Sequence, residues 1–399
     1  MNVLILALCQ AMLLSGTSLV VSSSALVGVA IAPNPALATL PLSLQFLTTM
    51  FVVAPASLLM KRFGRRPVFV LGAVIGAGGV AVAASAVHLG NFALFTAAGI
   101  LVGVHNAVGQ FYRFAAAESV EARWRSRAIS LTLAGGVLAS LIGPNIARFT
   151  KDLVQPAFTA SFAALLVTTL VAAGLSSLLR LKTSAETSSS GTTRPLRQIA
   201  RQPSFIVALA AATIAYATMN MVMTGAPLAM HAMMYPFPAT TLVIQWHVFA
   251  MFFPSFFTGD LVRRFGVLAT IAAGCLLELA AIGTNLAGQT MTHFLVALIC
   301  LGLVWNFMFV GATTLLGDVH SPAERARVQG LNDTFVFTAV TFSSLAAGAL
   351  VTHFGWVPTN LLALPGVTCV LVLVVWYGLT RSRVAAELVV TSPQRTPIG

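Results

Sequence analysis

Four residues in the second half of the chain have the types and the spacing to bind a soft metal ion: Met219, Met223, His247 and Met251. The members of each pair are four residues apart, so on a helix their side chains would share one face, about one turn apart. Thioether sulfur is a soft ligand that selects Cu(I), and imidazole also suits copper. Because both ligands are neutral, no anion has to be desolvated before the ion binds. The two motifs together predict a copper site.

Apolar packing is the alternative explanation for these motifs. Methionine fills irregular gaps in membrane helices, and apolar pairs four residues apart are ordinary on packed helices. A lone histidine in such a helix more often bonds to a neighbouring hydroxyl than to a metal. The metal interpretation therefore depends on the two motifs occurring together, on consecutive helices and at matched depth. Met221, between the two methionines of the first motif, should then point away from the site.

The elements that must position these residues are membrane-spanning helices. Of the 399 residues, 58% are hydrophobic and 8% are charged, whereas soluble proteins carry about a quarter charged residues. Apolar runs long enough to cross about 30 Å of hydrocarbon recur along nearly the whole chain. The first run has no basic segment before it and is too long for a signal peptide, so it is expected to be the first span. The predicted fold class is an all-α membrane protein with about twelve transmembrane helices.

Breaks marked by Pro, Gly, Asn and charged residues separate the expected spans. In the first half the spans are 5–30, 37–60, 67–88, 92–116, 127–149 and 157–180, and in the second half they are 204–227, 240–258, 267–288, 292–315, 330–352 and 358–380. Residues 228–239 form a short connection, so the seventh and eighth spans should be antiparallel neighbours. Met219 and His247 would then both lie about 10–12 Å below the same membrane surface.

The spans fall into two groups of six. Between the groups lies a basic, Ser/Thr-rich segment, 181–203, which is expected to be a flexible cytoplasmic linker. The predicted domains are an N-terminal six-helix bundle, 1–180, and a C-terminal six-helix bundle, 204–380. A polar tail, 381–399, is expected to be disordered and cytoplasmic.

Sequence patterns repeat between the two groups at an interval of about 200 residues. Lys-Arg-Phe-Gly at 61–64 recurs as Arg-Arg-Phe-Gly at 263–266. Arg-Ser-Arg-Ala-Ile-Ser-Leu at 125–131 recurs as Arg-Ala-Arg-Val-Gln-Gly-Leu at 325–331. Each match falls at the same topological point of its half. The two bundles are therefore expected to be pseudo-symmetric.

Basic residues set the expected orientation. They gather in the loops that follow spans 2, 4, 8 and 10, in the linker and in the tail, while only Arg148 and Lys151 stand out on the other side. By the positive-inside rule both termini and the linker are predicted to be cytoplasmic. The net charge of +12 is thereby explained without nucleic acid as a partner. The four cysteines lie singly in apolar runs and predict no disulfide framework.

The loop after the second span resembles a signature of the major facilitator superfamily, Gly-x-x-x-Asp-Arg-x-Gly-Arg-Arg. Residues 57–66 depart from it at Ser57, in place of Gly, and at Lys61, in place of Asp. They match it at four positions: Arg62, Gly64, Arg65 and Arg66. The resemblance implies that these four residues form a gating loop.

A second, weaker copy of the signature follows the eighth span. It keeps Gly259, Arg264 and Gly266, with Arg263 at the Asp position. The resemblance covers about residues 1–380. It implies a secondary transporter that works by alternating access, with the substrate site where the two bundles meet. Because both copies lack the aspartate, the family's usual gating charges are not carried over.

The Met–His motifs resemble the pair in CcoA-type copper importers, a bacterial branch of this superfamily that supplies copper for cytochrome oxidase assembly. The resemblance implies that Met219, Met223, His247 and Met251 bind copper as transported substrate and not as a cofactor. The predicted function is therefore import of copper, as Cu(I), across the bacterial inner membrane. Riboflavin uptake proteins are similar too, and uptake of riboflavin or another small organic solute is the alternative. A membrane sensor without transport activity is a third hypothesis.

Further candidates lie around the expected site. The loop after the seventh span could capture copper at the entrance, or could dip into lipid headgroups; its candidate residues are Met230, His231, Met233 and Met234. Glu278, in mid-span, is a candidate for proton coupling, or else bonds to a neighbouring helix. Asp333 is expected to open the eleventh span, where a carboxylate stabilises a helix N-terminus.

Three polar residues are candidates for the central cavity. Arg113 either faces that cavity or snorkels to the membrane surface. Asn106 and Asn306, at equivalent positions of the two halves, either line the cavity or bond helices together. The sequence contains no phosphate-binding loop, zinc spacing or nucleophile–base motif, so the chain is not expected to be an enzyme. It is expected to be a monomer in the lipid bilayer.

Overall fold

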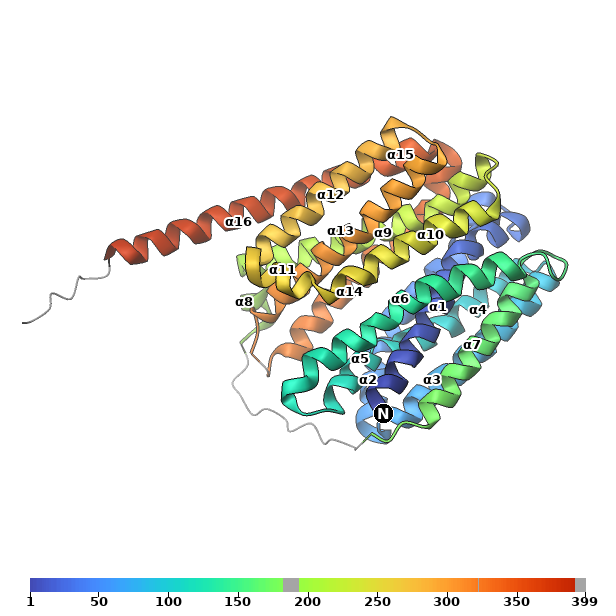
Figure 1. Cartoon of the computed structure of the whole chain (residues 1–399), viewed down its shortest axis with the longest axis horizontal. Coiled ribbons are helices and arrows are strands. Elements are labelled where there is room, and N and C mark those ends of the chain that lie inside the picture. The colour runs from blue at the N-terminus through green and yellow to red at the C-terminus, as the bar shows by residue number, and fades with distance from the viewer. Residues whose placement is uncertain (182–193, 322, 392–399) are drawn as a thin grey trace, which may run out of the picture.

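The computed structural model describes residues 1–181, 194–321 and 323–391. The described chain is all-helical, and twelve of its helical segments are long and apolar enough to cross a membrane. Figure 1 shows them in two groups, the helices of the first half in blue to green and those of the second in pale green through yellow to red. This confirms the predicted all-α membrane fold with two six-helix bundles. Most of the predicted linker, 182–193, and the end of the tail, 392–399, lie outside the described residues.

The six spans of the first half begin with α1, which starts at the second residue. In chain order the elements of this half are α1 (Asn2–Ile31), η1 (Pro35–Leu37), α2 (Leu40–Phe63), α3 (Arg65–His88), α4 (Phe92–Gly109), α5 (Tyr112–Glu118), η2 (Ala122–Trp124), α6 (Arg125–Thr150) and α7 (Thr159–Ser177). Helices α4 and α5 together form the fourth span. The Asn91 side chain accepts a hydrogen bond from the Leu94 N–H at 2.9 Å and so caps the start of α4.

The second half begins with a short helix that precedes its first span. Its elements are α8 (Leu196–Ala200), α9 (Pro203–Ala232), α10 (Phe237–Phe252), η3 (Phe253–Phe256), α11 (Thr258–Phe265), α12 (Val267–Ala287), α13 (Met291–Gly317), α14 (Arg325–Phe354), α15 (Trp356–Leu361) and α16 (Ala363–Thr391). Helix α16 continues to Thr391, past residue 380, where the twelfth span was expected to end.

Helix α9 is longer than its apolar run predicts. The expected span ends at residue 227, but α9 continues through Pro227 to Ala232. A proline inside a membrane helix is tolerated where neighbouring helices and local adjustments satisfy the freed backbone group, and residues 218–230 are buried without a break. The connection to α10 is therefore residues 233–236, and not 228–239 as expected.

Two glycines form the sharp turns that precede the third and ninth spans. Gly64, with φ of 85°, separates α2 from α3, and Gly266, with φ of 88°, separates α11 from α12. Glycine adopts this left-handed backbone at little steric cost, whereas other residues do so rarely. The same conformation at the same point of each half agrees with the repeated sequence patterns.

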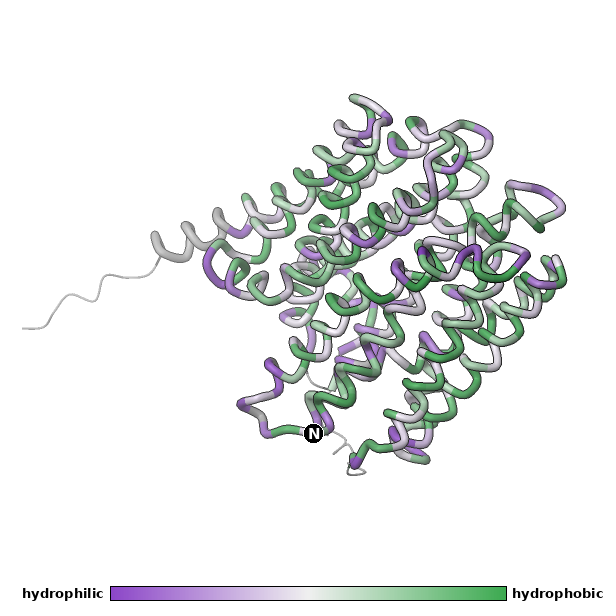
Figure 2. The backbone as a smooth tube through the Cα atoms, turned by 45° about the vertical axis from the view of Figure 1, so that its right-hand side comes forward, coloured by the Kyte–Doolittle hydropathy of each residue, from purple (hydrophilic) through white to green (hydrophobic). Residues whose placement is uncertain are grey.

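The packing of the helices places α1, α9 and α13 in the interior. In the first half α1 packs on α6 and α7, and α3 packs on α4 and α7. In the second half α9 packs on α13 and α14, while α12 packs on α13 and α16. The halves meet where α10 packs on α6 and α14 packs on α2. Figure 2 shows hydrophobic residues along most of the helices, and exposed large apolar side chains such as Val372, Trp376 and Leu379 on α16 suit contact with lipid.

We call the end that holds Asn2 and Arg180 the terminal face, and the opposite end the far face. The Asn2 side chain donates to the Arg180 carbonyl oxygen at 2.8 Å and accepts from the Arg180 N–H at 3.2 Å. The N-terminus is thereby fixed to the end of the sixth span, and both lie on the same side of the molecule as the start of α9 (Figure 1).

The described end of the linker is fixed to the second half by an ion pair. The Arg194 guanidinium donates to both carboxylate oxygens of Glu324, at 2.7 and 2.8 Å, and the Arg194 backbone N–H donates at 2.8 Å. The Ser321 N–H adds a hydrogen bond of 2.9 Å. The Arg194 guanidinium, with help from these N–H groups, holds the pKa of Glu324 well below its usual range. Part of the segment expected to be flexible, 194–203, thus has a fixed contact and the helix α8.

The two halves also contact each other near the far face. The Phe158 ring packs edge-on against the Phe237 ring at the start of α10, with centroids 5.0 Å apart. Lys151 Nζ lies 5.7 Å from the Phe158 centroid and 5.4 Å from the Phe237 centroid. The Thr39 hydroxyl donates to the Leu345 carbonyl oxygen at 3.4 Å. These contacts hold the halves together at the far face.

Candidate functional site

The predicted copper ligands all lie inside the protein. Met219 and Met223 are on α9, and His247 and Met251 are on α10; all four are buried. Met221, expected to point away from a site, is buried too, because this part of α9 is surrounded by other helices. Burial therefore does not distinguish the two predicted ligands on α9 from the residue between them.

Helices α9 and α10 are not paired along their length as expected. They contact each other little, whereas both pack extensively on α13. The reason is visible at Gly302 on α13, where a Cβ atom would lie 2.5 Å from the His247 carbonyl oxygen and 3.0 Å from the Met251 nitrogen. The missing side chain lets α10 and α13 approach closely. Because α10 packs closely on α13 around Gly302, the residues of α10 at this level contact α13 more than α9.

His247 takes part in this packing. Its Nδ1 lies 2.8 Å from the Leu298 carbonyl oxygen on α13, which requires a proton on Nδ1. The other ring nitrogen, Nε2, is then a lone-pair acceptor, and it is buried without a hydrogen-bond partner in the part of the chain described. His247 therefore makes no hydrogen bond to a methionine sulfur. A free imidazole nitrogen of this kind retains the capacity to bind a metal.

The residues predicted to capture copper at the entrance are separated by the extension of α9. Met230 is fully buried inside α9 and does not lie in a loop, contrary to expectation. His231, at the end of α9, is exposed, and Met233 and Met234 lie in the short connection, where Met234 is 87% exposed. Because Pro227 does not end the helix, only two of the four candidates are loop residues.

The predicted gating loop is tied to the first half by Arg65. Its Nη2 donates to Glu118 Oε1 at 2.5 Å, which joins the start of α3 to the end of α5. Arg62 and Arg264 instead lie over the rings of the phenylalanines that follow them, with the guanidinium carbon 5.2 and 5.3 Å from the centroids. Glu118 was not identified from the sequence; it supplies an acidic partner that the loop itself lacks.

The two predicted cavity asparagines have different surroundings. Asn306 Nδ2 donates to the Met251 carbonyl oxygen at 2.7 Å and to Ser255 Oγ at 2.8 Å, and Oδ1 accepts from the Thr258 hydroxyl at 2.5 Å. Its amide thus joins α13 to α10 and α11. Asn106 lines a pocket inside the first half together with other residues of α1, α3, α4 and α7.

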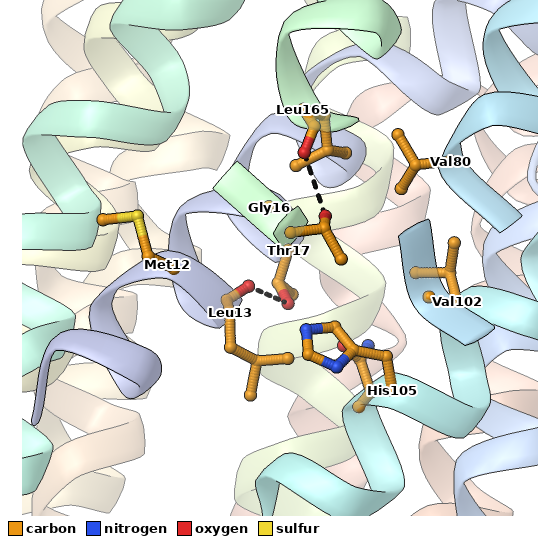
Figure 3. A pocket seen from close by; sticks show the side chains of 11 residues that line it. Met12, Leu13, Gly16, Thr17, Val80, Val102, His105 and Leu165 are labelled. Carbon is orange, nitrogen blue, oxygen red and sulfur yellow. Dashed lines mark hydrogen bonds between the residues drawn. The ribbon is translucent and has the colours of Figure 1, made fainter. Parts of the chain in front are cut away.

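That pocket is too small for an organic solute. Figure 3 shows Thr17 and His105 on its wall, and its volume is about 10 Å³, room for about one water molecule. The Thr17 hydroxyl donates to the Leu13 carbonyl oxygen of its own helix at 3.2 Å. The Thr17 hydroxyl is thus bonded within its own helix, whereas His105 Nδ1 is buried without a hydrogen-bond partner in the described part of the chain.

Five aromatic side chains converge from four helices of the second half. We call them the aromatic cluster: Tyr216 on α9, Phe252 on α10, Trp305 and Phe309 on α13, and Phe337 on α14. Trp305 and Phe309 are stacked, with centroids 5.0 Å apart and planes at 16°. Tyr216 meets both rings edge-on, at 5.5 and 5.1 Å. These are the preferred arrangements of aromatic pairs, so the cluster is an ordered aromatic surface.

The aromatic cluster lies deep in the membrane-spanning region. Tyr216, Trp305 and Phe337 are each about twelve residues, or about 18 Å, from the end of their helix at the terminal face. Trp305 is buried and its indole Nε1 has no hydrogen-bond partner among the described residues. Tyr216 and Phe337 are only partly buried. A ring surface that is partly open and bordered by an unused donor is suited to a planar ligand.

Two opposite charges lie beside the aromatic cluster, nearer the terminal face. Arg113 on α5 interacts electrostatically with Asp333 on α14 and with Tyr216. In the described part of the chain the two charges are not within ion-pair distance of each other. Arg113 lies over the Phe114 ring at 4.9 Å, and its Nε has no hydrogen-bond partner within the described ranges. Whether Arg113 faces a central cavity or snorkels to the membrane surface stays a prediction.

Asp333 does not open its helix as expected. Helix α14 begins at Arg325, two turns earlier, because the basic segment 325–331 is helical as well. Asp333 Oδ1 accepts a hydrogen bond of 3.2 Å from Asn332 Nδ2. Its carboxylate is therefore free of a capping role and lies in the interior of the span.

Glu278 lies on α12, close to the part of α9 that carries the first Met–His motif. It is buried on α12, interacts with Thr218 on α9, and has one carboxylate oxygen without a partner within the described chain. Thr218 directly precedes Met219 in sequence. The carboxyl group is thus buried on the side of α9, and both of its expected roles, proton coupling and a bond to a neighbouring helix, stay predictions.

Sequence reasoning did not identify the aromatic cluster. The chain has 26 phenylalanines, so aromatic residues in a span carry little information individually. The one local indication is the spacing of Trp305 and Phe309, four residues apart on one helix face. The contribution of α9 and α14 depends on how the helices pack, which no local pattern specifies.

Comparison with known proteins agrees with this architecture. The Major Facilitator Superfamily pattern matches residues 4–277 and 210–397. The riboflavin transporter RfnT of Brucella anthropi is 39% identical over 374 residues, which cover 93% of this chain and 94% of the relative. The uncharacterized MFS-type transporter YdeG of Bacillus subtilis is 27% identical over 84% of this chain and 81% of its own.

The fold is also similar to that of a solved structure. The crystal structure of a bacterial homologue of the iron transporter ferroportin, in an outward-facing state, superposes with a TM-score of 0.67 at 14% identity. The match covers 95% of this chain and 99% of that one. Twelve membrane spans in two bundles, together with sequence matches along nearly the whole length, establish that the chain is a transporter of the Major Facilitator Superfamily.

Proposed function

We propose that this transporter takes up riboflavin or a closely related flavin across the bacterial inner membrane. The observation that carries the proposal is the aromatic cluster, whose rings converge from four helices and are bordered by Arg113, Asp333 and the free indole N–H of Trp305. The 39% identity to a riboflavin transporter supports the same substrate. This replaces copper, the substrate expected from the Met–His motifs, as the principal hypothesis.

The chemistry of the flavin ring matches these groups. The isoalloxazine ring is flat and aromatic, and one of its edges carries two carbonyl groups and an N–H. Stacked and edge-on aromatic contacts contribute about 0.5–1.5 kcal/mol each beyond burial of apolar area. Binding sites for such ligands are mainly apolar, with a few polar groups that fix the orientation. The aromatic cluster supplies the apolar surface, and Arg113, Asp333 and the Trp305 N–H supply the polar groups.

The orientation and the transport cycle are part of the proposal. Basic loops at the terminal face support a cytoplasmic position for that face by the positive-inside rule, and the far face would then be periplasmic. The contacts of Lys151 and Phe158 with Phe237 then close the periplasmic side in this conformation. Rocking of the bundles, 1–180 and 204–380, about the aromatic cluster would expose it to each side in turn.

Import of Cu(I) is the second candidate, and one observation favours it. His247 Nε2 is a buried lone pair with no partner in the described chain. Against it, His247 and Met251 are engaged with α13 through the Leu298 carbonyl and Asn306, and α9 contacts α10 little. These contacts support packing as the role of the Met–His motifs, although His247 Nε2 takes no part in them.

Parallel uptake assays decide between the two substrates. Cells that express the chain should accumulate radiolabelled riboflavin above vector controls, and excess unlabelled riboflavin should compete. Accumulation of radioactive copper in the same cells should equal that of the control. Copper accumulation that depends on the chain, with no riboflavin uptake, would reverse the proposal.

A further inference from the structure

We propose that Arg113, Asp333 and Trp305 together recognise the polar edge of the flavin ring and thereby determine which heterocycles are transported. The inference rests on the proposed function, because it assigns the substrate contacts of the same site. It concerns selectivity, whereas the aromatic cluster alone accounts for binding of a flat ring.

The first argument is the hydrogen-bonding capacity that these residues leave unused. Arg113 Nε and Trp305 Nε1 are both buried donors without a partner among the described residues. Nearly all buried polar groups in proteins are hydrogen-bonded, and a group left unpaired costs about 1–3 kcal/mol. Two such donors beside one aromatic surface are available to a ligand with acceptor atoms.

The second argument is the separation of the two charges. Arg113 and Asp333 attract each other electrostatically, but the described chain shows no ion pair between them. Asp333 accepts one hydrogen bond, from Asn332, and a carboxylate can accept about four. A ligand edge that carries both acceptors and a donor would bridge this gap and satisfy both charges.

The third argument is position. Arg113 lies about five residues from the end of α5 at the terminal face, and Asp333 about eight residues from the start of α14, or about 8 and 12 Å along their helix axes. The aromatic cluster is deeper. Arg113 and Asp333 both interact electrostatically with Tyr216 of the aromatic cluster, so the polar groups border the ring surface on the side of the terminal face.

The pyrimidine edge of a flavin has the matching pattern. Its C2 and C4 carbonyl oxygens accept hydrogen bonds, for which Arg113 and Trp305 are the donors. The N3–H between them donates, for which Asp333 is the acceptor. Because one positive and one negative charge sum to zero, the site suits the neutral riboflavin ring and gives no net attraction to a phosphorylated flavin.

A gating pair is the competing explanation for Arg113 and Asp333. Two opposite charges on different halves could form an ion pair when the bundles rock, without touching the substrate. Loss of such a pair would slow transport of every flavin equally. Recognition of the polar edge predicts instead that the preference among flavins changes, and this difference is the basis of the test.

The experiment compares riboflavin with N3-methylriboflavin, in which the N3 donor is blocked, as substrates of the full-length protein in proteoliposomes. The unaltered protein should prefer riboflavin by about tenfold or more, the loss expected for one charge-assisted hydrogen bond. In Asp333→Ala the preference should fall to below about threefold. Arg113→Met should weaken uptake of both flavins by about tenfold or more.

Matched controls are available on the same chain. Arg148 also lies over the ring of the residue that follows it, at 5.5 Å, but on α6 near the far face, so Arg148→Met should leave both rates unchanged. Asp318, exposed at the end of α13, gives the control Asp318→Ala. If neither site variant inserts into the membrane, the uptake ratio of the two flavins by the unaltered protein still tests the inference. Equal uptake of the two flavins overturns it.

The outcomes separate the inference from the proposed function. Riboflavin uptake with no preference over the N3-methyl compound, or an unchanged preference in Asp333→Ala, overturns the assignment of the polar edge and leaves flavin transport in place. Equal slowing of both flavins in Asp333→Ala, at the original ratio, supports the gating pair and also overturns the inference. Absence of any flavin uptake by the unaltered protein overturns the proposed function itself.

Discussion

Two regions in the second half of this transporter differ in how clearly the sequence marks them: the Met–His motifs and the aromatic cluster. The Met–His motifs on α9 and α10 have a regular spacing, and the structure buries them in contacts with α13. The aromatic cluster has no common spacing, yet its side chains converge from four helices beside unpartnered donors. Ordinary helix packing produces the same regular spacing on one helix face as a binding motif does. Convergence of unsatisfied groups is what a ligand site requires, and it is seen only in three dimensions.

The largest effect is expected from removal of the rings at the centre of the aromatic cluster. Trp305→Ala and Tyr216→Ala each remove a ring contact and, in the first case, a donor. Loss of such an anchor costs about 2 kcal/mol or more, or about thirtyfold in affinity. Riboflavin uptake by cells, corrected for the amount of protein in the membrane, should fall by at least that factor.

Trp246→Ala is the matched control for this prediction. Trp246 also packs against a phenylalanine, Phe249, at 5.5 Å, but it is exposed on α10 outside the aromatic cluster. Uptake by this variant should equal that of the unaltered protein. Equal losses in Trp246→Ala and Trp305→Ala would mean that the aromatic cluster is not distinguished from other aromatic residues of the bundle.

An intermediate effect, on stability and not on transport, is expected at His247. His247→Ala removes the hydrogen bond to the Leu298 carbonyl and leaves a gap between α10 and α13. The free energy of unfolding should fall by about 1–3 kcal/mol, measured as a lower melting temperature in detergent. Riboflavin uptake should stay within about threefold of the original. Unchanged stability with loss of copper accumulation would restore the metal site.

The smallest effects are expected at the methionines. Met219→Leu and Met223→Leu conserve side-chain volume, so each should cost less than about 1.5 kcal/mol of stability, and riboflavin uptake should stay within about twofold. Met221→Leu is the internal control and should behave the same, because all three residues are equally buried. A copper site would separate them: the first two variants would lose copper transport and the third would not.

Much of the fold could be predicted because apolar runs and basic loops are local features. The twelve spans and the repeat of two six-helix bundles follow from short stretches of sequence. The repeated Phe-Gly at 63–64 and 265–266 falls where the structure has its sharp turns, although no turn was predicted there. Errors came at helix ends. Pro227 was expected to end α9, and the basic segment before Asp333 was expected to precede α14, but surrounding helices stabilise both as helix.

The candidate site could be predicted only in part. Arg113 was identified because an arginine in a span is costly and unusual. Tyr216, Trp305 and Phe337 were not, because their relation depends on the packing of α9, α13 and α14 and not on spacing. His247 was identified as a ligand from its spacing to Met251, but its hydrogen bond to α13 comes from residues about fifty positions away.

The most direct test of the central claim is equilibrium binding of riboflavin to the purified protein, followed by quenching of flavin fluorescence. Stacking against the aromatic cluster predicts saturable quenching that is weakened about thirtyfold or more in Trp305→Ala, remains in His247→Ala and is unaffected by Ag(I) used as a stand-in for Cu(I). Binding that is unchanged in Trp305→Ala but abolished by Ag(I) or by His247→Ala would contradict the account and return the substrate site to the Met–His motifs.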